Sequence, residues 1–271
     1  MSPSPWRLTH VSEIDSTSLQ ARRLVNTGRA GTAHELIVAD RQTGGIGRLS
    51  RPWASPAGGL WCTFILPASP DVQSDAPGSS PPPIHPWKWD RLLSTLGLRA
   101  ALAVRAAIVD TIPDLADGPR LRIKWPNDTL LDGRKVSGVL CEVLRRRNGG
   151  PVALIGVGIN ANYDISQLPA DLHARATTLQ SALGRAVPLD ALREHLGVRL
   201  AEMLDADLRT PRIARLVRKH LAGVGEAGPI TLDDGTRTSG VLQGLNDAGE
   251  AMFTVDGRTI TARSAAIVDD H

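Results

Sequence analysis

ADRQTGGIGRLSRPWASPAGG, residues 39–59, joins two stretches that read as buried strands, residues 35–40 and 60–66. It carries five glycines and three arginines, and it is several times longer than an ordinary strand connection of about two to six residues. Flexible backbone N–H groups and arginines suit phosphate, and Trp53 at the loop edge could stack on a base or close a lid. The composition indicates a binding loop, with a mobile surface connection as the alternative.

Composition limits the class of protein. At 271 residues and 42% apolar content the chain can bury a substantial core. It has no uncharged apolar run of 18 residues and no apolar h-region at MSPSPWRLTH, so we expect a cytoplasmic protein without a membrane span. A net charge of +3 is too small to indicate nucleic-acid binding, and no DNA partner is expected. Cys62 and Cys141 lie outside any metal-binding spacing and are expected to be buried small hydrophobes.

The remaining pattern predicts an α+β fold. Ser16 is expected to cap a helix that Gly28 ends, and a long helix is expected over residues 88–110. The Pro-rich residues 67–86 read as a solvated excursion. Asp-Gly and Asn-Gly-Gly hairpin signals join further strands, expected over residues 121–125, 128–131, 134–144 and 151–159. The central sheet should therefore be mixed or antiparallel and flanked by helices.

A different pattern follows toward the C-terminus. Helices are expected over residues 188–208 and 212–221. After Gly225, short alternating strands punctuated by DDG, NDAG and VDG predict a small β-barrel. We therefore predict two domains, residues 1–224 and 225–271.

KWPND, beginning at Lys124, is a second concentration of polar residues. Pro126 ends the strand, so Asn127 and Asp128 should project from its end. Lys135 follows a predicted tight turn and should lie at the same end of the sheet. Only four of the 31 basic residues are lysines, and two of them are in this region. A lysine, an amide and a carboxylate would suit an anionic ligand with a metal; an ordinary turn beside an exposed lysine is the alternative.

GVGINAN, residues 156–162, is the third segment that could contribute to a binding site. Its strand-end glycines would permit close approach of a ligand, and Asn160 offers a donor and an acceptor to an adenine edge. The stretch lacks the third glycine and the helix of a dinucleotide fingerprint, and close packing on a neighbouring strand is the alternative. No Ser-His-Asp arrangement or pair of catalytic acids stands out. A site of Arg, Lys, Asn and backbone N–H groups fits adenylyl transfer, which requires positioning and neutralisation of phosphate charge.

Together these blocks resemble the biotin protein ligase family. STSLQA (16–21), the loop of residues 39–59, KWPND, GRKVSGVLCE (133–142) and GVGINAN occur in the family's order and spacing, and the loop is similar to its G-R-G-R-x-G-R-x-W element. The resemblance implies a class II synthetase-like α+β domain with a C-terminal SH3-like barrel. It also implies an enzyme that joins biotin and ATP into biotinyl-5′-AMP, releases pyrophosphate, and passes biotin to a lysine of a biotin carboxyl carrier domain.

The resemblance implies binding and catalytic roles for the residues that match the family's motifs. The biotin site would comprise Ser16, Thr17, Gln42, Gly45, Gly47, Arg48, Lys135 and Gly138. The ATP and adenylate site would comprise Arg48, Arg51, Trp53, Lys124, Asn127, Lys135 and Asn160. The catalytic residues would be Lys135, Arg48, Arg51 and Asp128. Asp128, with Asn127, would also order Mg²⁺ and the phosphates.

Three positions depart from the family pattern. Ile46 replaces the first loop arginine, Ser50 replaces a glycine and Ser18 replaces an asparagine. We expect weaker retention of the intermediate with activity preserved. A lipoate or octanoate ligase, which shares the fold, and a non-catalytic biotin or nucleotide sensor with a decayed loop are the alternatives.

Two further expectations concern assembly. About fifteen residues precede the first motif, so we do not expect an N-terminal DNA-binding domain in this sequence. Oligomeric state is not readable from the sequence, although exposed strands of the central sheet could pair across a two-fold axis and give a homodimer.

Overall fold

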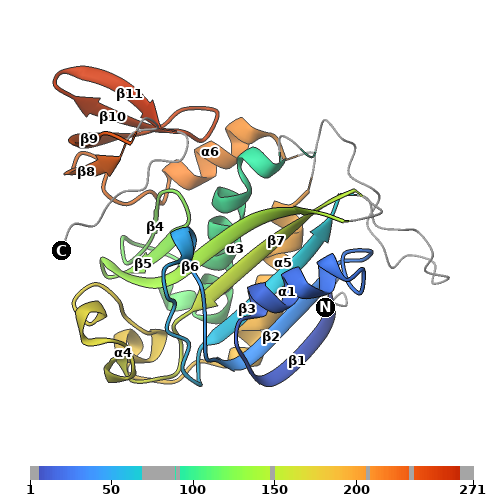
Figure 1. The fold of residues 1–271 in the computed structure, drawn as a ribbon. Helices are drawn as coiled ribbons and strands as arrows, with labels where there is room; N and C mark the ends of the chain where they lie inside the picture. Colours follow the sequence, from blue (N-terminus) through green and yellow to red (C-terminus); the bar gives the residue numbers. More distant parts are fainter. Residues whose placement is uncertain are drawn as a thin grey trace.

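The computed structural model describes residues 6–68, 89, 92–146, 150–205, 208–231 and 235–262 (Figure 1). Nearly all of the Pro-rich excursion and most of the expected Asn-Gly-Gly turn lie outside these residues. No helix among the described residues is long and apolar enough to cross a membrane.

A seven-stranded sheet forms the centre of the protein, in the order β1-β2-β3-β7-β6-β5-β4. Its strands are β1 Arg7–Ile14, β2 Glu35–Gln42, β3 Leu60–Pro67, β4 Leu121–Lys124, β5 Asp128–Leu131, β6 Arg134–Arg145 and β7 Pro151–Ile159. β1 pairs with β2 in parallel and every other pairing is antiparallel. The predicted mixed sheet is therefore confirmed.

The turn between β5 and β6 follows its sequence signal. Asp132 and Gly133 both have positive φ, 51° and 75°. A two-residue hairpin turn of this kind needs left-handed backbone at both central positions, which Asp-Gly tolerates. The register continues from Leu131 opposite Arg134 to Leu130 opposite Lys135. The hairpin thus brings Lys135 back beside β5, as expected.

Helices cover both faces of the sheet (Figure 1). They are α1 Thr17–Asn26, α3 Leu96–Thr111, α4 Leu179–Leu183, α5 Leu189–Met203 and α6 Thr210–Arg218. Short 3₁₀ turns occupy Arg48–Ser50, Pro113–Leu115, Ile165–Gln167 and Ala170–Leu172. Ser16 caps α1 by accepting a hydrogen bond from the backbone N–H of Leu19, and Gly28 follows the helix with φ of 71°, as predicted.

The long helix expected over residues 88–110 is interrupted. α3 begins at Leu96, and Thr95 separates it from the helical residues 92–94 because its backbone leaves helical geometry, with φ −121° and ψ 12°. The Thr95 hydroxyl accepts a hydrogen bond from Nε of Arg99 at 2.9 Å. The predicted continuous helix is therefore wrong at its N-terminal end.

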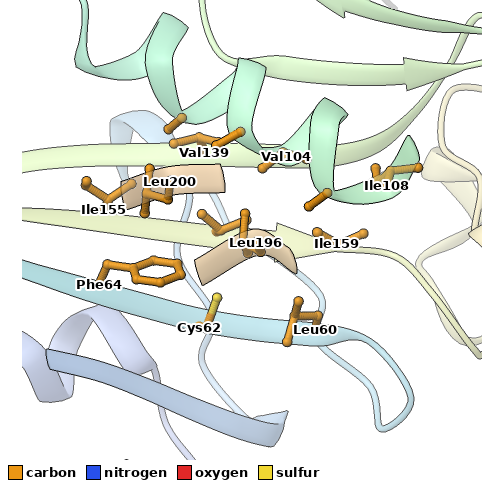
Figure 2. Packing of buried hydrophobic residues seen from close by; sticks show 14 of the residues in the cluster. Leu60, Cys62, Phe64, Val104, Ile108, Val139, Ile155, Ile159, Leu196 and Leu200 are labelled. Atoms are coloured by element: carbon orange, nitrogen blue, oxygen red, sulfur yellow. The ribbon is translucent and has the colours of Figure 1, made fainter. Parts of the chain in front are cut away.

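Alternation along β7 explains both the core and the hollow beside it. Ile155 and Ile159 face α3 and α5, where they pack in one cluster with Phe64, Val104 and Leu196 (Figure 2). The intervening positions point to the α1 face, because successive side chains of a strand alternate. Leu154 packs there in the α1 cluster, but the next two positions on that face are glycines, at 156 and 158. The sheet is therefore open beyond the start of α1.

The C-terminal region is a four-stranded antiparallel sheet in the order β11-β10-β9-β8. Its strands are β8 Ala227–Thr231, β9 Arg237–Leu245, β10 Ala251–Val255 and β11 Arg258–Ala262. Phe253 and Leu242 share a hydrophobic cluster with Leu102 of α3 and Val217 of α6. Nε1 of Trp125, just beyond β4, donates to the carbonyl of Gly249 at 3.2 Å. The small sheet is thus packed onto the end of the larger one.

Strand β1 has no counterpart in the sequence-based prediction. Most of its residues are exposed, and it lies at the edge of the sheet with β2 as its neighbouring strand. RLTHVSEI therefore lacks the apolar alternation by which a half-buried strand is recognised. Pairing with β2 defines this strand.

His34 should make stability fall in mild acid. Its ring stacks on Trp6 with centroids 5.1 Å apart, and burial lowers its pKa from 6.5 to about 4. Between pH 6.5 and 4 the unfolded chain binds a proton at this site that the folded protein does not, so folding is progressively disfavoured. We expect the loss in unfolding free energy between pH 7 and pH 4 to be smaller in His34→Phe by on the order of 2 kcal/mol, measured with urea. Equal losses in both proteins would contradict this assignment.

Candidate active site

A cavity of about 760 Å³ opens on the α1 face of the sheet, between the loop of residues 43–53 and residues 168–176. It collects side chains from every block that the sequence analysis singled out. The predicted site residues on its wall are Ser16, Thr17, Gln42, Gly47, Arg48, Arg51, Trp53, Lys124, Asn127, Asp128, Lys135, Gly138 and Asn160. Of the predicted residues, Gly45 alone does not line it.

One end of the cavity is uncharged and hydrogen-bonded. The Gln42 side-chain oxygen accepts from the backbone N–H of Thr17 at 2.8 Å and lies 3.1 Å from the Thr17 hydroxyl. The amide nitrogen of Gln42 donates to Ser55 at 2.8 Å. The hydroxyl of Thr63, a residue that the sequence analysis missed, lies 2.9 Å from that of Thr17 and 3.0 Å from that of Ser18. This network holds the first turn of α1 against β3 and presents polar groups to a neutral ligand.

The glycine–arginine loop is closed by its own backbone. Trp53 N–H donates to the Gly45 carbonyl and Gly47 N–H to the Arg51 carbonyl, both at 2.8 Å. A Cβ at Gly45 would lie 2.4 Å from the Trp53 carbonyl oxygen, so glycine is required there for close packing. Gly45 therefore sits behind the cavity wall. Its predicted contact with biotin has no support from this geometry.

Trp53 crosses the floor of the cavity. Cβ atoms at Gly138 and Gly158 would lie 3.1 and 2.6 Å from its ring, so these glycines make room for the indole. The Lys135 ammonium nitrogen is 5.1 Å from the ring centroid. The Trp53 Nε1 is buried and has no hydrogen-bond partner among the described residues. A buried unpaired donor costs about 1–3 kcal/mol, so the indole is a ready donor to a ligand acceptor.

The other end of the cavity is positively charged. Its wall carries five cations, Arg48, Arg51, Lys124, Lys135 and Arg175, and two carboxylates, Asp128 and Asp171. Each carboxylate is already paired: Asp128 with Lys135 at 2.6 Å, and Asp171 with Arg175 at 2.9 Å. The remaining positive charge favours an anionic ligand.

Asn127 links the loop to the sheet. Its side-chain oxygen accepts from Arg48 at 3.4 Å, and its amide nitrogen donates to the backbone carbonyl of Val139. The amide therefore orients an arginine that lies on a flexible glycine-rich loop. Asn127 and Arg48, 79 positions apart in the chain, are brought together as the sequence analysis expected.

Residues 168–176 form a wall that the sequence analysis did not identify. Lys135 N–H donates to the carbonyl of Arg175, and Thr177 N–H donates to the carbonyl of Lys135, at 2.8 and 2.9 Å. Asn160 is buried, and its amide nitrogen donates to the Thr177 carbonyl at 3.1 Å. Asn160 thus supports this wall, and its contact with an adenine stays a prediction. The segment contains no recognisable motif, so no sequence signal could have placed it.

Neither cysteine has the properties of a reactive thiol. Burial raises the pKa of Cys62 and of Cys141 to about 12, so neither thiol is ionised near neutral pH. Cys62 is buried and Cys141 partly buried, close to the expectation of small core residues. Within the described residues, no three His, Cys, Asp or Glu side chains cluster as a metal site.

Comparison with known proteins identifies the family. Residues 29–160 match the Biotin/lipoate A/B protein ligase family. The chain is 31% identical over 246 residues to the biotin–[acetyl-CoA-carboxylase] ligase of Paracoccus denitrificans, an alignment that covers 88% of this chain and 90% of that protein. The chain belongs to the biotin protein ligase family. The resemblance inferred from the five sequence blocks is therefore confirmed.

Other members of the family extend the comparison. The bifunctional ligase/repressor BirA of Bacillus spizizenii is 34% identical over 191 residues, which is 70% of this chain and 51% of that protein. The chain thus spans about half the length of the Bacillus relatives. A biotin protein ligase from Aquifex aeolicus, solved in complex with biotin and ATP, superposes with a TM-score of 0.73 at 27% identity and covers 95% of this chain and 96% of that one. The fold is the family's α+β fold, including the small C-terminal sheet.

Proposed function

We propose that this protein is an ATP-dependent biotin protein ligase that forms biotinyl-5′-AMP and then biotinylates a lysine of a biotin carboxyl carrier domain. The observation that carries the proposal is a single cavity with an uncharged hydrogen-bonding end beside α1 and a cationic end at Lys135. A urea-like ring and a carboxylate–phosphate centre require these two environments. The proposal is supported by the biotin and ATP in the Aquifex structure and by the activity in the name of the Paracoccus relative.

In the first half-reaction a biotin carboxylate oxygen attacks the α-phosphorus of ATP. An oxygen–phosphorus bond forms, the bond from the α-phosphorus to the bridging oxygen breaks, and pyrophosphate leaves with the electron pair. Ser16, Thr17 and Gln42 would hold the ureido ring. Lys135 and the loop arginines would offset the repulsion between the two anions and the charge that develops on the phosphoryl oxygens.

Mg²⁺ is the expected metal. Mg²⁺ is usually bound by one or two carboxylates together with substrate phosphates, and Asp128 beside the amide of Asn127 fits this pattern. When bound, the ion would neutralise phosphate charge. Asp128 also holds the Lys135 ammonium at 2.6 Å, so it positions a cation with or without a metal.

In the second half-reaction the neutral amine of the acceptor lysine attacks the acyl carbon of the adenylate. The new carbon–nitrogen bond replaces the carbon–oxygen bond to AMP, which leaves with its electron pair, and the amine passes one proton to Asp128 or to solvent. Asp128 is the carboxylate proposed to assist the incoming lysine. The loop of residues 43–53 would close over the mixed anhydride and exclude water.

The decisive experiment is ATP–pyrophosphate exchange by the purified protein with biotin, lipoate or octanoate. We expect exchange with biotin alone. Exchange with lipoate or octanoate instead would favour the related ligase activity. Measurable biotin binding without exchange would favour a non-catalytic sensor.

Ile46 should weaken retention of the adenylate. The residue lines the cavity where the family pattern has an arginine, so one cation that could hold the phosphate is missing. We expect biotinyl-5′-AMP to leave Ile46→Arg more slowly than it leaves the wild type, by about 10-fold, as one charge-assisted hydrogen bond would give. Ile46→Leu is the matched control and should retain the wild-type off-rate. A wild-type off-rate no faster than that of Ile46→Arg would refute the hypothesis.

Domain boundaries, assembly and compartment complete the proposal. We place the boundary between residues 1–224 and 225–271, and the small sheet would help to close the site. A chain ending near Gly225 that folds and ligates at full rate would contradict this.

β4 is bridged on its outer side by Leu221, so β1 is the edge of the sheet that favours a homodimer. A monomeric mass by light scattering at micromolar concentration would exclude that dimer. We expect a cytoplasmic location and no DNA partner.

A further inference from the structure

Helix α6 and its flanks carry a row of exposed cations. Arg209, Arg212, Arg215 and Lys219, here called the basic strip, are all exposed. The last three recur at helical spacing, whereas Ile213 and its neighbours on the other side of the helix are buried. No side chain of the strip forms a hydrogen bond or an ion pair with the described residues. Cations without internal partners leave their full charge to an outside surface.

The remaining cation of α6, Arg218, differs from the basic strip because its charge is paired within the protein. Arg218 donates to the carbonyl of Leu245 at 2.7 Å and pairs with Asp247 at 2.5 Å. It ties the helix to the C-terminal sheet. The basic strip makes no such contact, so packing of that sheet does not account for it.

The basic strip leads toward the candidate active site. Beyond the end of α6, the chain pairs with Ile123 of β4: Ile123 N–H donates to the carbonyl of His220 at 2.7 Å, and Ala222 N–H donates to the carbonyl of Ile123 at 2.9 Å. The next residue of β4, Lys124, is in the wall of the cavity. The end of the strip therefore lies beside a strand that terminates in the site.

A second hollow lies beside β4 and the segment that follows α6, and no residue of the basic strip lines it. It has a volume of about 240 Å³, and Arg122, Glu226 and residues 221–224 line it. Leu130 and Gly133 line both this hollow and the large cavity. Val224, on its wall, leaves 52% of its surface exposed. A partner lying on the basic strip would thus meet a partly apolar recess that adjoins the reaction centre.

We propose that the basic strip and the adjoining hollow are the docking surface for the acceptor protein, and this proposal rests on the proposed ligase function. The acceptor would be a carrier domain with acidic side chains around its target lysine. The acceptor lysine must reach an adenylate inside the cavity, so the domain that carries it must lie against the rim. A carrier domain that reaches the cavity across the hollow would come near the C-terminal end of the strip, where exposed cations would steer an acidic partner and set its orientation. A duplex nucleic acid is disfavoured by a net charge of only +3 and by the absence of a recognition motif.

Two double charge reversals test the proposal. Arg212→Glu/Arg215→Glu changes the basic strip. Arg7→Glu/Arg29→Glu is the control, because it also removes two exposed arginines without ion pairs among the described residues and lowers the net charge by the same amount. Arg7 lies on β1, the edge of the sheet opposite to β4 (Figure 1). Each variant is assayed for exchange with biotin and for transfer to the unbiotinylated carrier domain of an acetyl-CoA carboxylase.

The expected result separates the two half-reactions. The strip variant should raise the KM for the carrier domain about 10-fold at roughly 50 mM salt and much less at roughly 300 mM, because salt screens exposed charges. Its exchange rate should equal that of the wild type. The control should change the KM less than about 2-fold. If the strip variant also loses exchange, Arg212→Gln/Arg215→Gln replaces it, with a KM increase of about 3-fold expected.

An unchanged KM in the strip variant, or an equal rise in the control, would overturn the proposal. Salt-sensitive binding of duplex DNA that the strip variant loses, with its KM unchanged, would assign the strip to nucleic acid. Absence of biotin-dependent exchange in the wild type is a different outcome, since it would contradict the proposed function before docking is involved.

Discussion

Lys135→Ala is expected to lower kcat/KM for biotin-dependent ATP–pyrophosphate exchange about 10²–10³-fold while the protein stays folded. The Lys135 ammonium is fixed from two sides, by Asp128 at 2.6 Å and by the Trp53 ring at 5.1 Å. A charge held in place before the reaction stabilises the transition state without reorganisation, which corresponds to roughly 3–4 kcal/mol. Removing it also leaves the Asp128 carboxylate unpaired, facing the phosphates.

Two companion variants make the measurement specific. Lys135→Arg retains the charge, but its planar fork is larger than an ammonium, so we expect only partial recovery of exchange. Arg134→Ala is the matched control: the residue is adjacent, exposed and absent from the cavity wall, and its exchange should stay within about 2-fold of the wild type. Full exchange by Lys135→Ala would remove this residue from the mechanism. If the wild type shows no exchange and Lys135→Ala binds biotin as well as the wild type does, a non-catalytic sensor would be favoured.

Arg99→Met is expected to destabilise the fold by about 3–5 kcal/mol. Arg99 is 2% exposed, and burial lowers its pKa to about 10, so it remains charged near neutral pH. Its guanidinium donates to the backbone carbonyls of Met203, Asp205 and Leu208, where α5 ends. A methionine fills similar space but leaves these acceptors without donors. The penalty comes from the unpaired carbonyls and persists even when the new side chain packs well.

Chemical denaturation of Arg99→Met against Arg212→Met measures this effect. Arg212 is an exposed arginine without a partner among the described residues, so its replacement should change the unfolding free energy by less than about 0.5 kcal/mol. A difference of less than about 1 kcal/mol between the two variants would show that water satisfies the carbonyls at the end of α5. Arg99 does not line the cavity, so the exchange activity of the folded Arg99→Met fraction should be retained.

Local signals account for the parts of the fold that were predicted well. The Asp-Gly turn placed Lys135 beside β5 because few dipeptides tolerate two successive left-handed residues. The Ser16 cap placed the start of α1, and with it Thr17 at the cavity. In each case the structural preference resides in two or three neighbouring residues.

Nonlocal contacts account for the parts that were missed. β1 is a strand because β2 lies beside it, and the Thr95 break coincides with a buried arginine whose acceptors lie more than 100 positions away. Residues 168–176 reach the cavity through backbone bonds to Lys135, which no side-chain pattern encodes. Gly45, conversely, was assigned to the biotin site by resemblance, and a Cβ at this position would lie closest to Trp53, Ser55 and Gln42.

The sequence by itself determined most of the helices and strands, the turn chemistry and the kinds of side chain gathered at the strand ends, because those follow from propensities and spacings within a few residues. Only the tertiary structure decided that an uncharged end and a cationic end share one cavity, and that the segment after α6 pairs with β4, whose last residue lines that cavity. These are arrangements of segments far apart in the chain. They depend on burial and pairing summed over the whole fold, which no short stretch specifies.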